Sequence, residues 1–143
     1  MSLSVSSGSE ARRLAGGESV NLLVRPNREA NVYCFLQDEQ GQIVRFFPNR
    51  FQRDSRVTGA GLQLPGAGHF RLVLNARGVT ETVACFATER DVLGELPDDM
   101  KHVDLEALRV GSLDQVKAAF LNVSSGVLGQ ETIDLHPEAS GRR

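Results

Sequence analysis

Two short stretches of this chain read almost alike, and each contains one of its two cysteines. The first runs Val-Tyr-Cys-Phe-Leu over residues 32–36, and the second runs Val-Ala-Cys-Phe-Ala over residues 83–87. Their β-branched and aromatic residues predict β-strands. Side chains alternate between the faces of a strand, so Cys34 shares a face with Val32 and Leu36, and Cys85 shares one with Val83 and Ala87. The chain is therefore expected to fold around a buried sheet face on which both cysteines lie.

The pairing of Cys34 and Cys85 is open at this point. A disulfide between the two strands would close a loop of about fifty residues and stabilise the fold by about 4 kcal/mol in the chain-entropy model. In a reducing compartment the same residues would be two buried free thiols, since free cysteine is among the most buried residue types. The bonded form would indicate a periplasmic or other extracytoplasmic location.

Length and composition indicate a single globular domain. The chain has 143 residues, of which 41% are hydrophobic and 24% charged. We expect a flexible lead-in or cloning remnant over residues 1–17, one domain over 18–136 and a polar tail over 137–143. The formal net charge of −2 gives no general attraction to nucleic acid. No apolar run is long enough for a membrane helix and residues 1–17 lack a signal-peptide core, so direct membrane insertion is not expected.

Strand patterns with turn signals between them continue along the chain. They predict a mainly β fold, an antiparallel β-sandwich of about seven to eight strands, either immunoglobulin-like or a partly open barrel. The expected core residues lie on the apolar phase of their strands: Val32, Cys34, Leu36, Phe70, Leu72, Leu74, Val83 and Cys85.

One amphipathic helix is predicted near the C-terminus, over residues 113–122. Ser112 and Gln115 have the spacing of a capping box, and Leu113, Val116 and Phe120 follow at helical spacing. We expect these three side chains to pack on the β core, and a last strand over residues 130–136 to return to the sheet.

Several pieces of the chain resemble, in order, the bacterial family called domain of unknown function 4384. The matching pieces are Gly17, Glu18 and Val20; Asn31–Phe35; Asp38 and Gly41; Phe46-Phe47-Pro48-Asn49; Gly59–Gly61; Leu64-Pro65; and Glu81–Cys85. The resemblance implies a non-catalytic β module that accompanies other domains in envelope and secreted proteins. It implies no catalytic residue and no cofactor, and its partner would be another protein or an upstream domain of the same polypeptide.

Four arginines surround the Phe46-Phe47-Pro48-Asn49 motif: Arg45, Arg50, Arg53 and Arg56. Guanidinium groups suit carboxylate and phosphate oxygens, so the cluster is a candidate site for an anion or an acidic partner. The alternative is a solvated basic loop, because charge clusters on loops are common. Two functions follow as hypotheses: a module that binds protein through a sheet edge or this loop, and a small-ligand or anion sensor.

Enzymatic and metal chemistry have little support in the sequence. A cysteine nucleophile needs an accessible thiolate beside a histidine, whereas Cys34 and Cys85 lie mid-strand on the inward phase. His69, His102 and His136 are widely spaced, with no close pair to anchor zinc. We therefore expect neither an enzyme nor a metal site.

Overall fold

The computed structural model describes residues 2–7, 14–15, 22–38, 41–49, 53–64, 81–101, 108, 111–124, 128–135 and 137–138. Eight strands within these ranges form two antiparallel sheets. The three-stranded sheet has the order β1 (Leu3–Ser7), β3 (Leu22–Pro26), β7 (Leu62–Leu64). The five-stranded sheet has the order β5 (Ile43–Phe47), β4 (Ala30–Gln37), β8 (Glu81–Thr88), β9 (Gly129–Leu135), with β6 (Arg56–Val57) pairing the start of β4.

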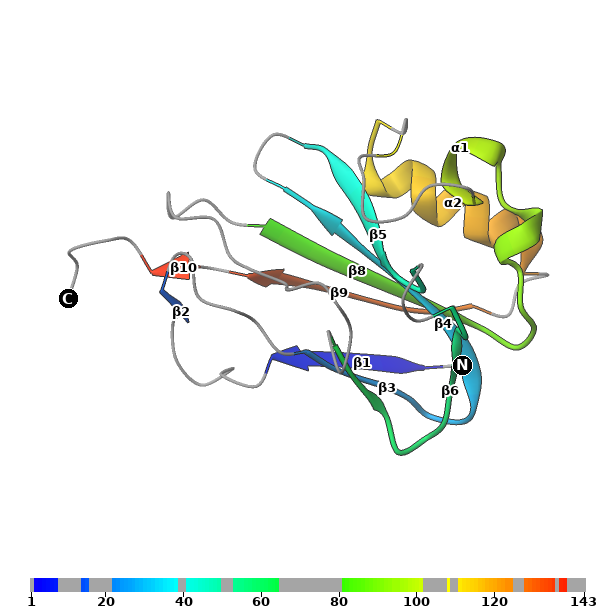
Figure 1. Cartoon of the computed structure of the whole chain (residues 1–143), viewed down its shortest axis with the longest axis horizontal. Coiled ribbons are helices and arrows are strands. Elements are labelled where there is room, and N and C mark those ends of the chain that lie inside the picture. The colour runs from blue at the N-terminus through cyan, green and yellow to red at the C-terminus, as the bar shows by residue number, and fades with distance from the viewer. Residues whose placement is uncertain are drawn as a thin grey trace.

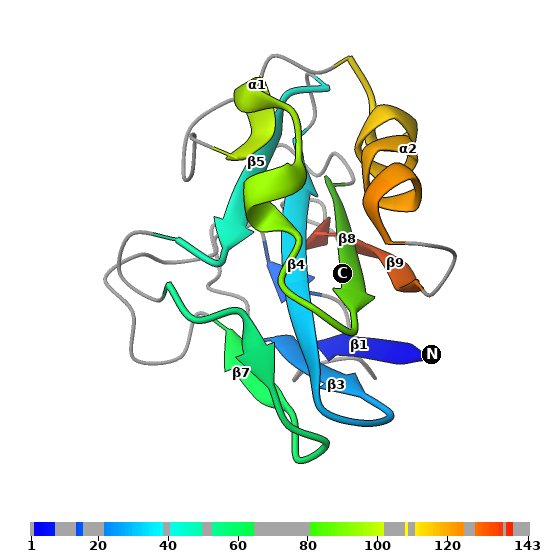
Figure 2. The ribbon, with the colours of Figure 1, turned by 90° about the vertical axis from the view of Figure 1, so that its right-hand side faces the viewer.

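The described elements stack in three layers, with the five-stranded sheet in the middle. The three-stranded sheet lies on one side, and α1 (Asp98–Lys101) and α2 (Leu113–Val123) lie on the other (Figures 1 and 2). A 3-10 turn, η1 (Leu93–Glu95), leads from β8 towards the helices. At one edge β1 lies beside β9, so the two sheets approach each other there. The predicted mainly β sandwich with one C-terminal amphipathic helix is confirmed.

The central strands are buried on both faces. On β4, residues 30–35 are all buried. We call the face towards the three-stranded sheet the inner face; it carries Val32, Cys34, Val83, Cys85 and Ala87, among the apolar residues packed between the sheets. The outer face, towards the helices, carries Tyr33, Phe35, Ala84 and Phe86. Two hydrophobic cores therefore share one sheet.

The predicted core is confirmed where the structure describes it. Val32, Cys34, Val83 and Cys85 are buried, and Leu36 is partly buried against the same core. The remaining three predicted core residues, Phe70, Leu72 and Leu74, lie outside the described residues.

The predicted lead-in is wrong for residues 3–7, which form β1. Leu3 and Val5 are buried, and Val5 pairs with Val24 of β3. The ladder begins at Ser2, whose backbone carbonyl accepts a hydrogen bond from the amide of Asn27. The strand pattern was hidden because serines alternate with only two apolar residues.

A further strand pair involves the predicted polar tail. Within it, β10 (Pro137–Glu138) pairs in parallel with β2 (Leu14–Ala15), which itself belongs to the predicted lead-in. These two short segments, far apart in the sequence, meet through backbone pairing, which side-chain patterns do not reveal.

Helix α2 confirms the predicted amphipathic helix. The Ser112 hydroxyl caps it by accepting from the amide of Gln115 at 3.2 Å. The Gln115 side chain accepts from the amide of Gly111, one residue before the cap, rather than from Ser112 itself. Val116 and Phe120 are fully buried, and Leu113 packs against the same outer core. The last strand also forms, as β9.

Candidate functional site

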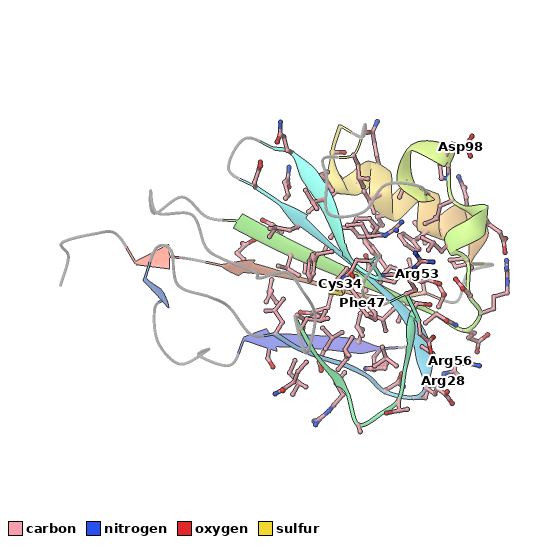
Figure 3. All side chains as sticks on the ribbon, viewed as in Figure 1. Arg28, Cys34, Phe47, Arg53, Arg56 and Asp98 are labelled. Atoms are coloured by element: carbon pink, nitrogen blue, oxygen red, sulfur yellow. A yellow bond between two sulfur atoms is a disulfide. The ribbon has the colours of Figure 1, made fainter. Side chains whose placement is uncertain are left out.

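The centre of the molecule is a disulfide between Cys34 and Cys85. The two residues face each other directly in the β4–β8 ladder, with their Cα atoms 4.1 Å apart. Both are fully buried on the inner face, and Figure 3 shows Cys34 near the middle of the sheet. Of the two interpretations that the sequence left open, the structure contains the bonded one.

The Phe46-Phe47-Pro48-Asn49 motif forms a turn held by its own side chains. A register shift in the β4–β5 pairing places both Phe46 and Phe47 in the inner core. The Phe47–Pro48 peptide bond is cis. The Asn49 amide donates to the Phe46 carbonyl at 2.7 Å. The motif's polar residue is thus used to shape the end of β5.

Arg45 does not belong to an exposed anion patch, contrary to expectation. It is 5% exposed and lies on the same side of the sheet as Phe35, its partner in the β4–β5 ladder. Its Nε donates to the Pro48 carbonyl at 3.0 Å and its Nη1 to the Met100 carbonyl at 2.8 Å. Sheet alternation turns the side chain under α1, where it fastens the helix to the turn after β5.

The other three arginines of the predicted patch are separated. Arg50 lies outside the described residues. Arg56 is exposed and faces Glu29, with 3.4 Å between Nε and Oε2. Arg53 is exposed, and no ion pair to it is present in the described part of the chain. Among the described arginines of the motif, Arg53 alone remains as a candidate for binding an external anion.

The end of the sheet near Arg56 carries a second ion pair. Arg28, next to Glu29 in the β3–β4 turn, contacts Glu89 at 2.6 Å after β8, and Figure 3 shows Arg28 and Arg56 at the same end of the molecule. All four side chains are about half exposed. Exposed pairs of this kind contribute little to stability, so this end is a surface of mixed charge.

Comparison with known proteins identifies one matching family model. The family model described as "Domain of unknown function (DUF4384)" matches residues 13–91, more than half of the chain. The chain belongs to the DUF4384 family. No curated protein and no solved structure matches it. The DUF4384 segment contains β3 to β8, both cysteines and the Phe46–Asn49 turn, while α2 and β9 follow it.

A buried polar cluster at the end of the DUF4384 segment was not predicted. The Tyr33 hydroxyl donates to Asp91 Oδ1 at 3.0 Å and accepts from the amide of Val92 at 2.9 Å. Burial raises the pKa of Tyr33, and the hydrogen bond from the Val92 amide works against that rise. The sequence does contain a signal for this cluster. Tyr33 is the one tyrosine of the chain, and it lies next to Cys34, so the two side chains point to opposite faces of the strand.

Further polar side chains close the same end of the sheet. The Ser55 hydroxyl donates to Asn31 Oδ1 at 2.9 Å, and the Ser55 carbonyl accepts from the amide of Val32. The Thr88 hydroxyl donates to the Arg90 carbonyl at 2.6 Å. The Asn31 side-chain amide also donates to the Glu89 carbonyl at 3.5 Å, so the start of β4 is tied both to the segment before β6 and to the residues after β8.

Among the described residues, the polar side chains of this cluster have a structural role. Each of its buried polar side chains, Asn31, Ser55 and Thr88, has a partner within the fold, as do Arg45 and Asn49. Within the described ranges no group of three or more histidine, cysteine or acidic side chains could hold a metal ion. None of the helices searched there is long and apolar enough to cross a membrane. The three histidines lie outside these ranges.

Proposed function

We propose that this DUF4384 chain is a non-catalytic accessory module that binds another protein, in a cell-envelope or secretion-related protein of a bacterium. The single observation that carries the proposal is the fully buried Cys34–Cys85 disulfide at the centre of the fold. Structural disulfides persist in oxidising compartments and are rare in reducing ones. The bridge thus supports a periplasmic or other extracytoplasmic location.

The use of polar side chains supports a scaffold role. Arg45 and Asn49 donate to backbone carbonyls, and Ser55 donates to Asn31, in each case to hold strands or turns in place. Catalytic groups are typically poised towards a substrate, with a nucleophile beside a base. The buried side chains of Arg45, Asn49 and Ser55 donate instead to the protein's own backbone and side chains.

Two sheet edges are poor candidates for a partner strand. The outer edge of β5 is covered in part by Leu108, whose amide donates to the Ile43 carbonyl at 2.8 Å. On β9, Glu131 lies opposite Cys85 and shares the inner phase with Ile133. An inward-facing charge on an edge strand discourages pairing with another chain. We therefore place the partner on an exposed side-chain surface rather than on these edges.

The alternative function, an anion sensor, is supported by fewer residues than the sequence predicted. Arg53 is exposed and no ion pair to it is present among the described residues, which suits a bound phosphate or carboxylate. Two of the four arginines of the predicted anion site are not available to an anion, because Arg45 is buried beneath α1 and Arg56 pairs with Glu29. We rank it second for that reason.

The location is tested by thiol labelling. The chain is produced with and without an export signal, denatured without reductant, alkylated and weighed intact. The exported protein is expected to carry no label, and removal of the disulfide by a reductant should expose two labelled cysteines. Two free thiols in the exported protein would refute the proposed location.

The interaction role is tested by site-specific photo-crosslinking in the exporting cell. A photoreactive residue replaces Arg53 before β6, Thr132 of β9 or Leu121 of α2, three exposed positions. A single protein adduct at one position and none at the others supports the module. No adduct at any position, together with saturable binding of inorganic phosphate that Arg53→Ala abolishes, would favour the anion sensor instead.

A further inference from the structure

The Cys34–Cys85 bond is enclosed by the fold. Both cysteines are 0% exposed. Apolar side chains of the three-stranded sheet, among them Leu22 and Val24, share the inner core with them. In the plane of the central sheet, β5 flanks β4 and β9 flanks β8. Neither cysteine therefore presents a surface to another protein in the folded chain.

The bond also lies within a continuous strand pairing. The β4–β8 ladder runs residue by residue from Asn31 opposite Thr88 to Gln37 opposite Thr82, and the two cysteines face each other within it. A sulfur becomes accessible when the three-stranded sheet lifts off or when the two central strands separate. Openings of that size belong to the high-energy end of native-state fluctuations, so they are rarely populated.

Formation of the bond requires close contact with an oxidant. Thiol–disulfide exchange proceeds through a mixed disulfide, in which a cysteine of the chain is bonded to a sulfur of the oxidant. A protein oxidant in this intermediate occupies the space next to Cys34 or Cys85, and in the folded chain the inner core fills that space. Exchange with a protein oxidant therefore has to precede closure of the inner face.

The two cysteines are far apart along the chain. They are 51 residues apart, and β5, β6 and β7 lie between them. Their meeting depends on the non-local pairing of β4 with β8, which is slow compared with local turns because a long loop has to close. When a chain enters a compartment N-terminus first, Cys34 arrives before Cys85. Cys34 is then the first of the two sulfurs that an oxidant meets.

We propose that the unfolded chain is a substrate of a disulfide-carrying protein oxidant, a dithiol–disulfide oxidoreductase, which acts on it before the inner face closes. Cys34 forms the mixed disulfide with this transient partner, and Cys85 resolves it. The inference rests on the extracytoplasmic location given under the proposed function, because it names the class of reaction that supplies the bond there.

The exchange balances in two steps. The Cys34 thiolate attacks the disulfide of the oxidant, so a bond forms between the two proteins and the second sulfur of the oxidant leaves as a thiolate. The Cys85 thiolate then attacks the Cys34 sulfur, which forms the Cys34–Cys85 bond and releases the first sulfur of the oxidant. In total, two electrons and two protons pass from the chain to the oxidant, which leaves as a dithiol.

The order of oxidation and folding has a consequence for export. A chain that folds while its cysteines are reduced encloses both thiols in the inner core, where a protein oxidant does not reach them. Such a chain would stay reduced after it arrived in an oxidising compartment. The exported chain therefore has to leave the reducing compartment unfolded.

The first test compares oxidation before and after folding. The whole chain is reduced in denaturant and then mixed with a purified, oxidised dithiol–disulfide oxidoreductase, either at the moment of dilution or after refolding under reductant and removal of the reductant. Alkylation and intact mass follow the loss of thiols, and circular dichroism shows that the chain has refolded. We expect the refolded chain to be oxidised at least about a hundredfold more slowly than the diluting chain. Equal rates for a refolded chain overturn the proposal.

The second test does not depend on refolding of the reduced chain. Cys85→Ala, Cys34→Ala and the double variant are exported, the cells are quenched with acid and alkylated, and adducts are separated without reductant. Cys85→Ala should accumulate a mixed disulfide with an oxidoreductase of the host, Cys34→Ala should accumulate less, and the double variant should show none. An adduct at Cys85 as abundant as that at Cys34 overturns the assigned order, and the lack of an adduct in either single variant overturns the proposal.

The outcomes separate this inference from the proposed location. Two free thiols in the exported unmodified chain would refute the location. An exported chain that is disulfide-bonded, but whose single-cysteine variants trap no oxidoreductase, would refute the assigned oxidation step alone.

Discussion

The two faces of the central sheet are equally well buried but are closed in different ways. On β4 and β8 the inner face carries small and aliphatic side chains; it lies under a second sheet and is crossed by the Cys34–Cys85 bond. The outer face carries aromatic rings and lies under helices, with Phe120 as the central contact. Burial alone does not show whether a surface is permanent. The inner face is cross-linked within its own sheet and covered by the side chains of a second sheet, whereas one short helix inserts a few side chains into the outer face.

The largest expected effect comes from removing the ring at the centre of the outer face. Phe120→Ala should lower the free energy of unfolding by about 3–5 kcal/mol, because a fully buried ring is replaced by a cavity. Leu121→Ala, on the exposed side of the same helix, should change it by less than about 0.5 kcal/mol. Denaturant titrations measure both. Similar values for the two variants would contradict the packing of α2 described above.

The inner face is tested by replacing both cysteines with alanine. Loss of the cross-link should cost about 2–4 kcal/mol, since the unfolded chain is freed from a loop spanning 51 residues. The docking of α2 should persist, and near-ultraviolet circular dichroism of its aromatic cluster checks this. In the native chain the buried bond should resist a reductant that cleaves it rapidly in denaturant. Equally rapid cleavage in both conditions would contradict its burial.

The attachment of α1 to the end of β5 is tested at Arg45. Arg45→Met keeps much of the apolar stem but removes both donors to the carbonyls of Pro48 and Met100, so a loss of about 2–3 kcal/mol is expected. Arg56→Met removes only an exposed ion pair and should cost less than about 1 kcal/mol. Thermal melts of the two variants compare a buried arginine with an exposed one. Equal losses of stability in the two variants would indicate that Arg45 is exposed, as the sequence predicted.

A smaller effect is expected at the polar end of the outer face. Tyr33→Phe leaves the Val92 amide without its acceptor and should cost about 1–2 kcal/mol. Burial also raises the pKa of Tyr33, so the unfolded chain loses this proton first as the pH rises. The stability that depends on the hydroxyl is therefore present below about pH 10, the ordinary tyrosine value, and is lost above it. The difference in the free energy of unfolding between wild type and Tyr33→Phe should therefore become smaller in alkali. A constant difference up to about pH 11, one unit above the ordinary tyrosine pKa, would contradict this.

The smallest effect should come from the exposed pair of Arg90 and Glu95. The hydrogen bond from Arg90 lowers the pKa of Glu95, so any stability from the pair is present at neutral pH and disappears as the carboxylate is protonated in acid. Both side chains are about half exposed, and salt screens such pairs. Glu95→Gln should therefore melt within error of wild type at physiological salt. A clear loss there would indicate that Glu95 also helps to hold the end of α2, through the arginine that contacts Val123.

Alternation along single strands was enough to predict the cysteine strands, the sandwich and the return strand β9. Helical spacing and a capping serine were enough to predict α2. The burial of Tyr33, Phe35 and Phe86 could also have been read from the sequence, because residues 32–36 and 83–87 are apolar on both phases, a pattern typical of strands covered on both sides. Alternation alone marks only one face of each strand, so it does not identify this second buried face.

The errors have a common physical origin in contacts between distant segments. Arg45 is expected at the surface unless the Met100 carbonyl, supplied by a later helix, is known to lie above it. Strand β1 has only Leu3 and Val5 to mark it, and its pairing with β3 provides the rest. Arg56 lies near the Phe46–Asn49 motif along the chain, but its partner Glu29 comes from the turn before β4 and contacts it across the sheet.

The bond between neighbouring strands also determines what survives a cut. Cys34 and Cys85 enclose β5, β6 and β7 in one covalent ring, so a protease that cleaves once anywhere between residues 35 and 84 opens the ring without releasing a piece. The cleaved chain gains only one water molecule, its fragments separate only when a reductant is added, and β4 remains joined to β8 at the middle of the sheet. If the module has the extracytoplasmic location proposed above, a single cut between the two cysteines would leave the two fragments of the domain attached to each other.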